Sequence, residues 1–130
     1  MKRWVAALAA GIVGTAAVAA GPAVAEDGDA AKGQRVFNAQ CRTCHKVEKD
    51  ASSPVGPTLH GLFGRTSGTL EGFQYSDAMK KAAIGWNAET LAEYLKDPKA
   101  KVPGTKMAYA GLKNPAQLVD LIAYLKEATK

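Results

Sequence analysis

The stretch Cys41-Arg42-Thr43-Cys44-His45 decides how this chain of 130 residues is interpreted. Two cysteines lie three positions apart, and a histidine follows the second one directly. This spacing lets two thiols reach the two vinyl groups on one edge of a haem while the imidazole binds the iron. It predicts one covalent haem, with Cys41 and Cys44 as the thioether residues and His45 as one axial ligand. The second axial ligand must come from elsewhere in the chain.

Other uses of the two cysteines fit the sequence less well. A thioredoxin-like pair follows a strand, and no alternating β pattern precedes Cys41. A zinc site would need two more ligands, but His60 is the only other histidine and there is no third cysteine. A disulfide between Cys41 and Cys44 would close a short, strained ring. A redox dithiol remains as the minor alternative.

The first 25 residues predict a cleaved signal peptide. Lys2 and Arg3 precede an uncharged, Ala-rich segment, residues 4–21, and Ala23-Val24-Ala25 offers a small-x-small cleavage site. An uncleaved segment could span a bilayer by its length, but Ala and Gly dominate it, which favours cleavage. Residues 26–130 then form one exported domain.

Size and charge limit the functions open to this domain. A single small domain is marginally stable without help, and a covalent haem would supply an apolar core. The formal net charge is +5, and cleavage would remove two of the positive charges. Nucleic-acid binding would need a denser basic stripe, so an acidic protein surface is the more economical partner.

Hydrophobic spacing predicts an all-α fold. A first helix over residues 29–40 would be capped by Asp29, and Gly33 on its buried face suggests that another helix crosses closely there. Three further helices are expected: residues 77–82 after the cap Ser76, a helix from Asn87 to Asp97-Pro98, and a last helix from Asn114 and Pro115 with its apolar stripe at Leu118, Leu121, Ile122 and Leu125.

Two long loops are expected, over residues 47–72 and 99–112, and neither carries a regular pattern. The second contains Pro103-Gly104-Thr105-Lys106-Met107. Met107 is far enough from His45 in the chain to reach the opposite haem face, whereas His60 lies in the same loop as His45. A soft thioether also favours reduced iron and suits an electron carrier. Met107 is therefore the predicted sixth ligand, and Met79 is interpreted as a core gap-filler.

These motifs together resemble class I cytochrome c, and more closely mitochondrial cytochrome c and the short bacterial cytochrome c₂ type. The resemblance covers essentially all of residues 26–130. It is carried by the pentad and by Val55-Gly56-Pro57-Thr58-Leu59-His60-Gly61-Leu62-Phe63-Gly64-Arg65, Tyr94-Leu95, Pro98-Lys99, Pro103-Gly104-Thr105-Lys106-Met107 and Asp120-Leu121-Ile122-Ala123-Tyr124-Leu125.

The resemblance implies a small cytochrome c fold of three to five helices wrapped around one covalent haem c. Its N- and C-terminal helices would cross, with Gly33 and Phe37 against Leu121 and Tyr124. It also implies that the Pro57 carbonyl accepts the second ring proton of His45. Tyr94 would point its hydroxyl at the Met107 sulfur. The positions that hydrogen-bond the haem propionates and a nearby water would be Tyr75, Arg65, Trp86 and Thr105.

The chain departs from the mitochondrial pattern at several positions. Met79 stands where those proteins carry an asparagine near the haem water, so that water network is in doubt. Tyr109 replaces a phenylalanine beside the haem edge. Gln40 and Thr43 leave fewer lysines around the pentad, so the docking charges of the family do not transfer directly.

The sequence is therefore expected to encode a soluble, monomeric, periplasmic one-electron carrier and not an enzyme. Filled axial positions suppress other iron chemistry, whereas a small peroxidase or gas sensor would need an open sixth site. The resemblance implies redox partners: a quinol-oxidising cytochrome bc-type complex as donor, and a reaction centre of photosynthesis or a respiratory terminal oxidase or reductase as acceptor. The basic charge balance favours acidic surfaces on these partners. No residue chooses between these pathways. The mature protein is expected to have no stable membrane insertion, and the docking lysines would be Lys99, Lys101, Lys106 and Lys113, extended by Arg35 and Lys46.

Overall fold

The computed structural model describes residues 27–130, so the predicted signal peptide over residues 1–25 lies outside the described residues. The described chain contains five helices: α1 (Ala30–Gln40), α2 (Asp77–Ala82), α3 (Ala88–Lys96), α4 (Pro98–Lys101) and α5 (Pro115–Ala128). Its only β pairing is an isolated bridge between Thr66 and Gly85. The prediction of a small all-α fold with three to five helices is confirmed.

The long helices begin at the residues that the sequence predicts. Asp29 caps α1, because its side chain accepts hydrogen bonds from the backbone amides of Ala31 and Lys32 at 3.0 and 3.1 Å. Asn114 caps α5 in the same way, and Pro115 occupies the first turn, where its missing N–H costs nothing. These local signals set where each helix starts.

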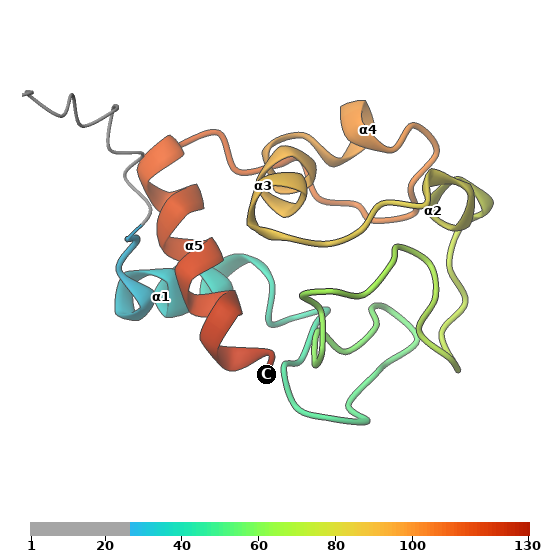
Figure 1. The fold of residues 1–130 in the computed structure, drawn as a ribbon, viewed down its shortest axis with the longest axis horizontal. Helices are drawn as coiled ribbons and strands as arrows, with labels where there is room; N and C mark the ends of the chain where they lie inside the picture. Colours follow the sequence, from blue (N-terminus) through green and yellow to red (C-terminus); the bar gives the residue numbers. More distant parts are fainter. Residues whose placement is uncertain (1–26) are drawn as a thin grey trace, which may run out of the picture.

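Helices α1 and α5 cross on one side of the molecule (Figure 1). A Cβ atom at Gly33 would lie 1.9 Å from the Asp120 carbonyl oxygen and 2.8 Å from Tyr124 Cβ, so only glycine permits this approach. The rings of Phe37 and Tyr124 pack with centroids 5.4 Å apart. The expected crossing is present, and the tightest contact of Gly33 is with the backbone of Asp120, while Leu121 is completely buried.

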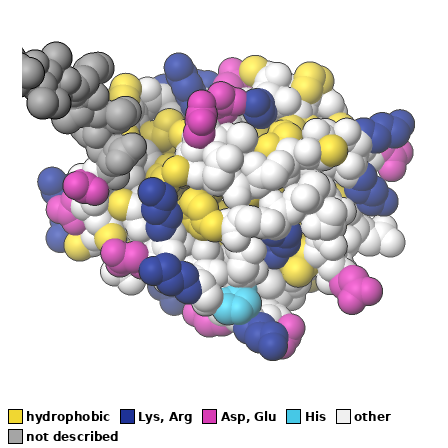
Figure 2. Space-filling view, in the orientation of Figure 1, with side chains coloured by type: hydrophobic (Ala, Val, Ile, Leu, Met, Phe, Trp, Pro, Cys, Tyr) yellow, Lys and Arg dark blue, Asp and Glu magenta, His cyan; other side chains and the backbone are white. Residues whose placement is uncertain are grey.

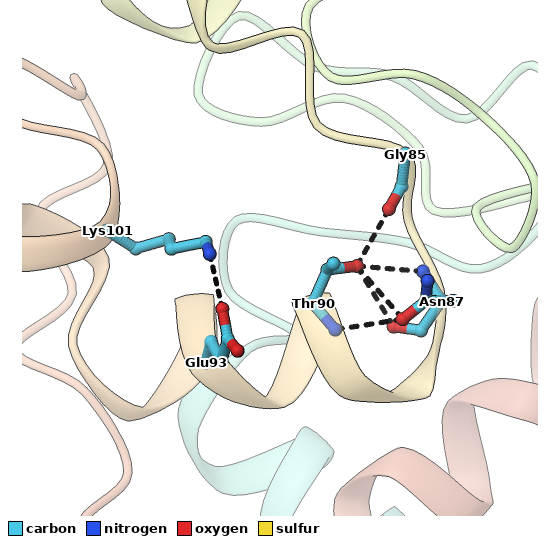
Figure 3. A network of polar contacts seen from close by, with 5 residues as sticks. All are labelled: Gly85, Asn87, Thr90, Glu93 and Lys101. Carbon is cyan, nitrogen blue, oxygen red and sulfur yellow. Dashed lines mark hydrogen bonds and ion pairs between the residues drawn. The ribbon is translucent and has the colours of Figure 1, made fainter.

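Helix α3 has a capping box at its start (Figure 3). The Asn87 side chain accepts from the Thr90 amide at 2.9 Å, and the Thr90 hydroxyl accepts from the Asn87 amide at 3.0 Å. The same hydroxyl donates to the Gly85 carbonyl at 2.7 Å, which ties the helix to the preceding loop. This reciprocal arrangement satisfies two amides that the helix itself leaves unpaired.

Helix α4 corrects the prediction of a continuous loop over residues 99–112. The helix α3 does end at Asp97-Pro98, but one helical turn then follows. It forms because Asp97 accepts from the Ala100 amide at 3.2 Å and Pro98 occupies the first helical position. An ion pair between Lys101 and Glu93 joins α4 to α3 (Figure 3).

The long segment between α1 and α2 has no helix and is held by hydrogen bonds within itself and to other parts of the chain. The Leu59 amide donates to the Lys46 carbonyl at 2.8 Å, and the Gly64 amide donates to the Trp86 carbonyl at 2.9 Å. Gly61 donates to the carbonyl of Thr129, just beyond α5. Figure 1 shows this segment, in green, curving round the side of the molecule opposite the α1–α5 crossing.

Candidate functional site

A cavity of about 570 Å³ lies among the helices and this long loop. Its walls are largely apolar and include Phe37, Leu62, Leu91 and Leu121. The volume falls in the range of pockets that hold cofactor-sized ligands. All ten site residues predicted from the sequence line this one cavity: Cys41, Cys44, His45, Pro57, Arg65, Tyr75, Trp86, Tyr94, Thr105 and Met107.

His45 is held by the segment that follows it. Its Nδ1 atom lies 2.9 Å from the Pro57 carbonyl oxygen. Because that oxygen can only accept, Nδ1 carries the proton and Nε2 keeps a lone pair for a metal. Burial lowers the pKa of His45, which favours the neutral imidazole that ligation requires.

Gly56 allows this approach. A Cβ atom there would lie 2.9 Å from Cε1 of His45 and 2.6 Å from the Cys44 carbonyl oxygen. The loop can therefore pass close enough for Pro57 to reach the imidazole only if position 56 lacks a side chain.

The two cysteines lie in a turn that directly extends α1. The Cys41 amide donates to the Phe37 carbonyl at 2.8 Å, and the His45 amide donates to the Cys41 carbonyl at 2.9 Å. Both thiols are free. Burial, with a smaller contribution from Cys44, raises the pKa of Cys41 to about 11. A redox dithiol needs the opposite shift, because the thiolate is the reactive form.

Met107 reaches the cavity on a loop that begins at Val102. Gly104 has φ +90°, and the Thr105 amide donates to the Val102 carbonyl at 3.0 Å, so the chain turns sharply before Met107. The Tyr94 hydroxyl lies 3.9 Å from the Met107 sulfur and 3.1 Å from Oγ1 of Thr105. Burial raises the pKa of Tyr94, so its hydroxyl remains a donor at neutral pH.

Comparison with known proteins agrees with this geometry. The family model for cytochrome c matches residues 30–129. The chain belongs to the cytochrome c family. It is 53% identical to cytochrome c of Gibberella zeae over 103 residues, which cover 79% of this chain and 97% of the relative. It is 52% identical to cytochrome c2 of Blastochloris viridis over 116 residues, 89% of this chain and 91% of the relative. Cytochrome c of Ginkgo biloba is 50% identical over 105 residues, 81% of this chain and 93% of the relative.

The resemblance to cytochrome c noted in the sequence is thus confirmed. The prediction of an electron carrier with haem c, and not an enzyme, is confirmed with it. The residues at the cavity fit the group: two thiols in one turn, an oriented imidazole, a thioether and apolar walls. Haem c supplies an iron that gains and loses one electron. The two thiols would attach the haem, the imidazole and the thioether would bind its iron, and the largely apolar walls would enclose it.

Arg65 and Tyr75 lie together on the polar part of the cavity wall. The Arg65 guanidinium donates to the carbonyls of His60 and Thr58, each at 3.1 Å. Burial lowers the pKa of Arg65 and raises that of Tyr75, and the attraction between the two groups opposes both shifts. Arg65 still carries its charge at neutral pH, so it can face an anionic group.

Of the other two candidate ligands, Met79 lines the cavity and His60 does not. Met79 is buried and lines the cavity, with its backbone held by Ser76 and Ser67. His60 is half-buried and does not line the cavity. Its backbone carbonyl accepts a hydrogen bond from the Arg65 guanidinium.

Two contributions to the site were missed by sequence reasoning. Gly56 was noted only as part of a motif, although a glycine directly before the proline that faces His45 is a usable signal. The Tyr109 hydroxyl donates to the side chain of Gln40, 69 positions away, and no local sequence pattern predicts such a bond.

Charge on the surface is mixed. On the face shown in Figure 2, basic and acidic side chains are interspersed. Lys101 pairs with Glu93, and Lys113 lies 3.5 Å from Asp97. Lys99 and Lys106 are exposed and have no ion pair within the described part of the chain. No helix in residues 27–130 combines the length and apolar character needed to cross a membrane.

Proposed function

We propose that this chain is a periplasmic electron carrier whose haem iron is bound by His45 and Met107 and whose haem is attached through Cys41 and Cys44. The observation that carries the assignment is the convergence of these four residues on one cavity, with His45 Nδ1 held 2.9 Å from the Pro57 carbonyl. That bond orients the imidazole and raises its basicity toward the iron.

The other predicted residues would tune and anchor the group. Tyr94 would donate to the Met107 sulfur, with Thr105 holding the tyrosine hydroxyl in place. The Trp86 ring packs against the Tyr94 ring at a tilt of 48°, with centroids 5.2 Å apart, which restricts how the tyrosine moves. Arg65 would face the propionates together with Tyr75.

Export is supported by the sequence. Residues 1–25 have the charge pattern and cleavage site of a signal peptide. The partners would be acidic redox proteins: a quinol-oxidising cytochrome bc-type complex on one side, and a reaction centre or terminal oxidase or reductase on the other. A monomer is sufficient for this role.

Replacing Met107 by Ala tests the axial ligand. The oxidised wild type should show the weak charge-transfer band from sulfur to iron, and Met107→Ala should lose it. The potential should fall, because a soft neutral sulfur favours reduced iron. Carbon monoxide should bind the reduced variant readily. Met79→Leu is the matched control and should keep the band; a wild type that already binds carbon monoxide contradicts the assignment.

Intact mass tests export and attachment together. Protein from a periplasmic extract should have the mass of residues 26–130 plus one haem, and acid-acetone should leave the haem in place. A species that keeps residues 1–25 would refute cleavage, and haem that extracts freely would refute the thioether bonds.

A further inference from the structure

The loop that carries Met107 is tied to α1 by the hydrogen bond from Tyr109 to Gln40. Gln40 is the last residue of α1 and directly precedes Cys41, whereas Tyr109 lies two positions after Met107. We propose that this bond is a latch that keeps the Met107 loop closed over the haem. Tyr109 and Gln40 are then positioning residues for the axial sulfur, an inference that rests on the proposed role of Met107.

The two residues meet at the rim of the cavity. Both of them line it, together with Cys41 and Met107. Gln40 is exposed and Tyr109 is half-buried, so the bond lies between solvent and the apolar interior. It joins the helix that presents the thiols to the loop that presents the sulfur.

The rest of this loop is held mainly at its ends. On one side the Thr105 amide donates to the Val102 carbonyl, and on the other the Leu112 amide donates to the Leu95 carbonyl at 2.8 Å. Among the described residues, the bond from Tyr109 is the only hydrogen bond that residues 108–111 make. The middle of the loop therefore depends on it more than either end does.

The chemistry of the pair is specific. A phenylalanine at position 109 could fill the same apolar space but could not donate to Gln40, so the hydroxyl is what connects loop to helix. The Gln40 side chain comes from a helix end fixed by the buried residues Val36 and Phe37. The latch thus fastens a less constrained segment to a well-packed one.

Opening of this loop can be measured with cyanide on the oxidised haem protein. Cyanide binds iron only after Met107 has left, so its limiting binding rate reports how often the loop opens. Loss of one hydrogen bond should raise that rate by about 2- to 10-fold in Tyr109→Phe and in Gln40→Ala. Because both changes remove the same bond, the double variant should be no faster than either single one.

Two control variants make the result specific. Gln34→Ala changes an exposed glutamine on the same helix and should leave the cyanide rate unchanged. Asn87→Ala removes the cap of α3, which lowers the free energy of unfolding away from the latch. It should not raise the cyanide rate to the level of Tyr109→Phe.

The outcomes distinguish failure of the latch proposal from failure of the assignment of Met107 as axial ligand. An unchanged rate in Tyr109→Phe, additive effects in the double variant, or an equal effect of Asn87→Ala would overturn the latch while the sulfur-to-iron band remained in every protein. A wild type without that band would instead overturn the assignment of Met107, and the latch with it.

Discussion

At the scale of single residues, Gly33 leaves less room for a Cβ atom than any other described glycine. An alanine normally stabilises a helix interior by about 1 kcal/mol relative to glycine. Here the added Cβ would lie 1.9 Å from the Asp120 carbonyl oxygen, so α5 would have to move away from α1. We expect Gly33→Ala to lower the free energy of unfolding by about 1–3 kcal/mol, as overpacking does.

Chemical denaturation of the haem protein measures the change in the free energy of unfolding. The sign of that change shows whether the steric clash or the helix propensity dominates. Gln34→Ala, on the exposed face of α1, serves as the control and should change the free energy of unfolding by less than about 0.5 kcal/mol. A Gly33→Ala protein more stable than wild type would show that the gain in helix propensity outweighs the steric cost of the added Cβ at the crossing of α1 and α5.

The single residues of the site differ in how far the sequence could predict them. Cys41, Cys44 and His45 follow from a fixed spacing, because the haem itself dictates it. The contact of Pro57 with His45 was expected only through the resemblance, and it depends on Gly56 letting two loop segments approach. The bond between Tyr109 and Gln40 could not be predicted, because nothing local encodes a meeting of residues 69 positions apart.

At the scale of elements, helices with caps and an apolar stripe were predicted almost to the residue. Asp29, Asn87 and Asn114 each accept hydrogen bonds from amides at most three positions ahead, so the signal and the structure it forms lie in the same short segment. Periodicity then marks the buried face of each helix. The starts of α1, α3 and α5 are therefore local properties.

Helix α4 was missed because it is too short to carry a recognisable hydrophobic pattern. Four residues, Pro98–Lys101, are too few to show a period. The turn exists because Asp97 ends one helix and caps the next, and because Lys101 reaches back to Glu93. Proline after an aspartate was interpreted as a stop, although the same pair also starts a helix.

At the scale of the whole molecule, the charges near Met107 should govern docking. Lys106 lines the cavity and has no ion pair among the described residues, whereas Lys113 lies 3.5 Å from Asp97. Weak redox complexes depend on electrostatic steering of the association rate. We expect Lys106→Glu to slow electron transfer with an acidic redox partner by on the order of 10-fold at low salt.

Stopped-flow rates across a series of salt concentrations provide the measurement. Lys130→Glu, at the far end of the chain, carries the same change of charge and should have a smaller effect. The difference between the two should shrink as the Debye length falls toward about 8 Å at physiological salt. Equal effects at the two lysines, or a rate independent of salt, would refute electrostatic docking at this edge.

The crossing of α1 and α5 also determines when the chain can fold. The Asp29 amide donates to Asp120 across 91 positions, and Gly33 meets the same residue, so the first helix finds its partner only in the last one. A chain that emerges from a ribosome or a membrane channel N-terminus first cannot close this contact until its final residues are free. Long-range closure of this kind is entropically costly and late. The packing of α1 against α5 must therefore wait until the last helix is available.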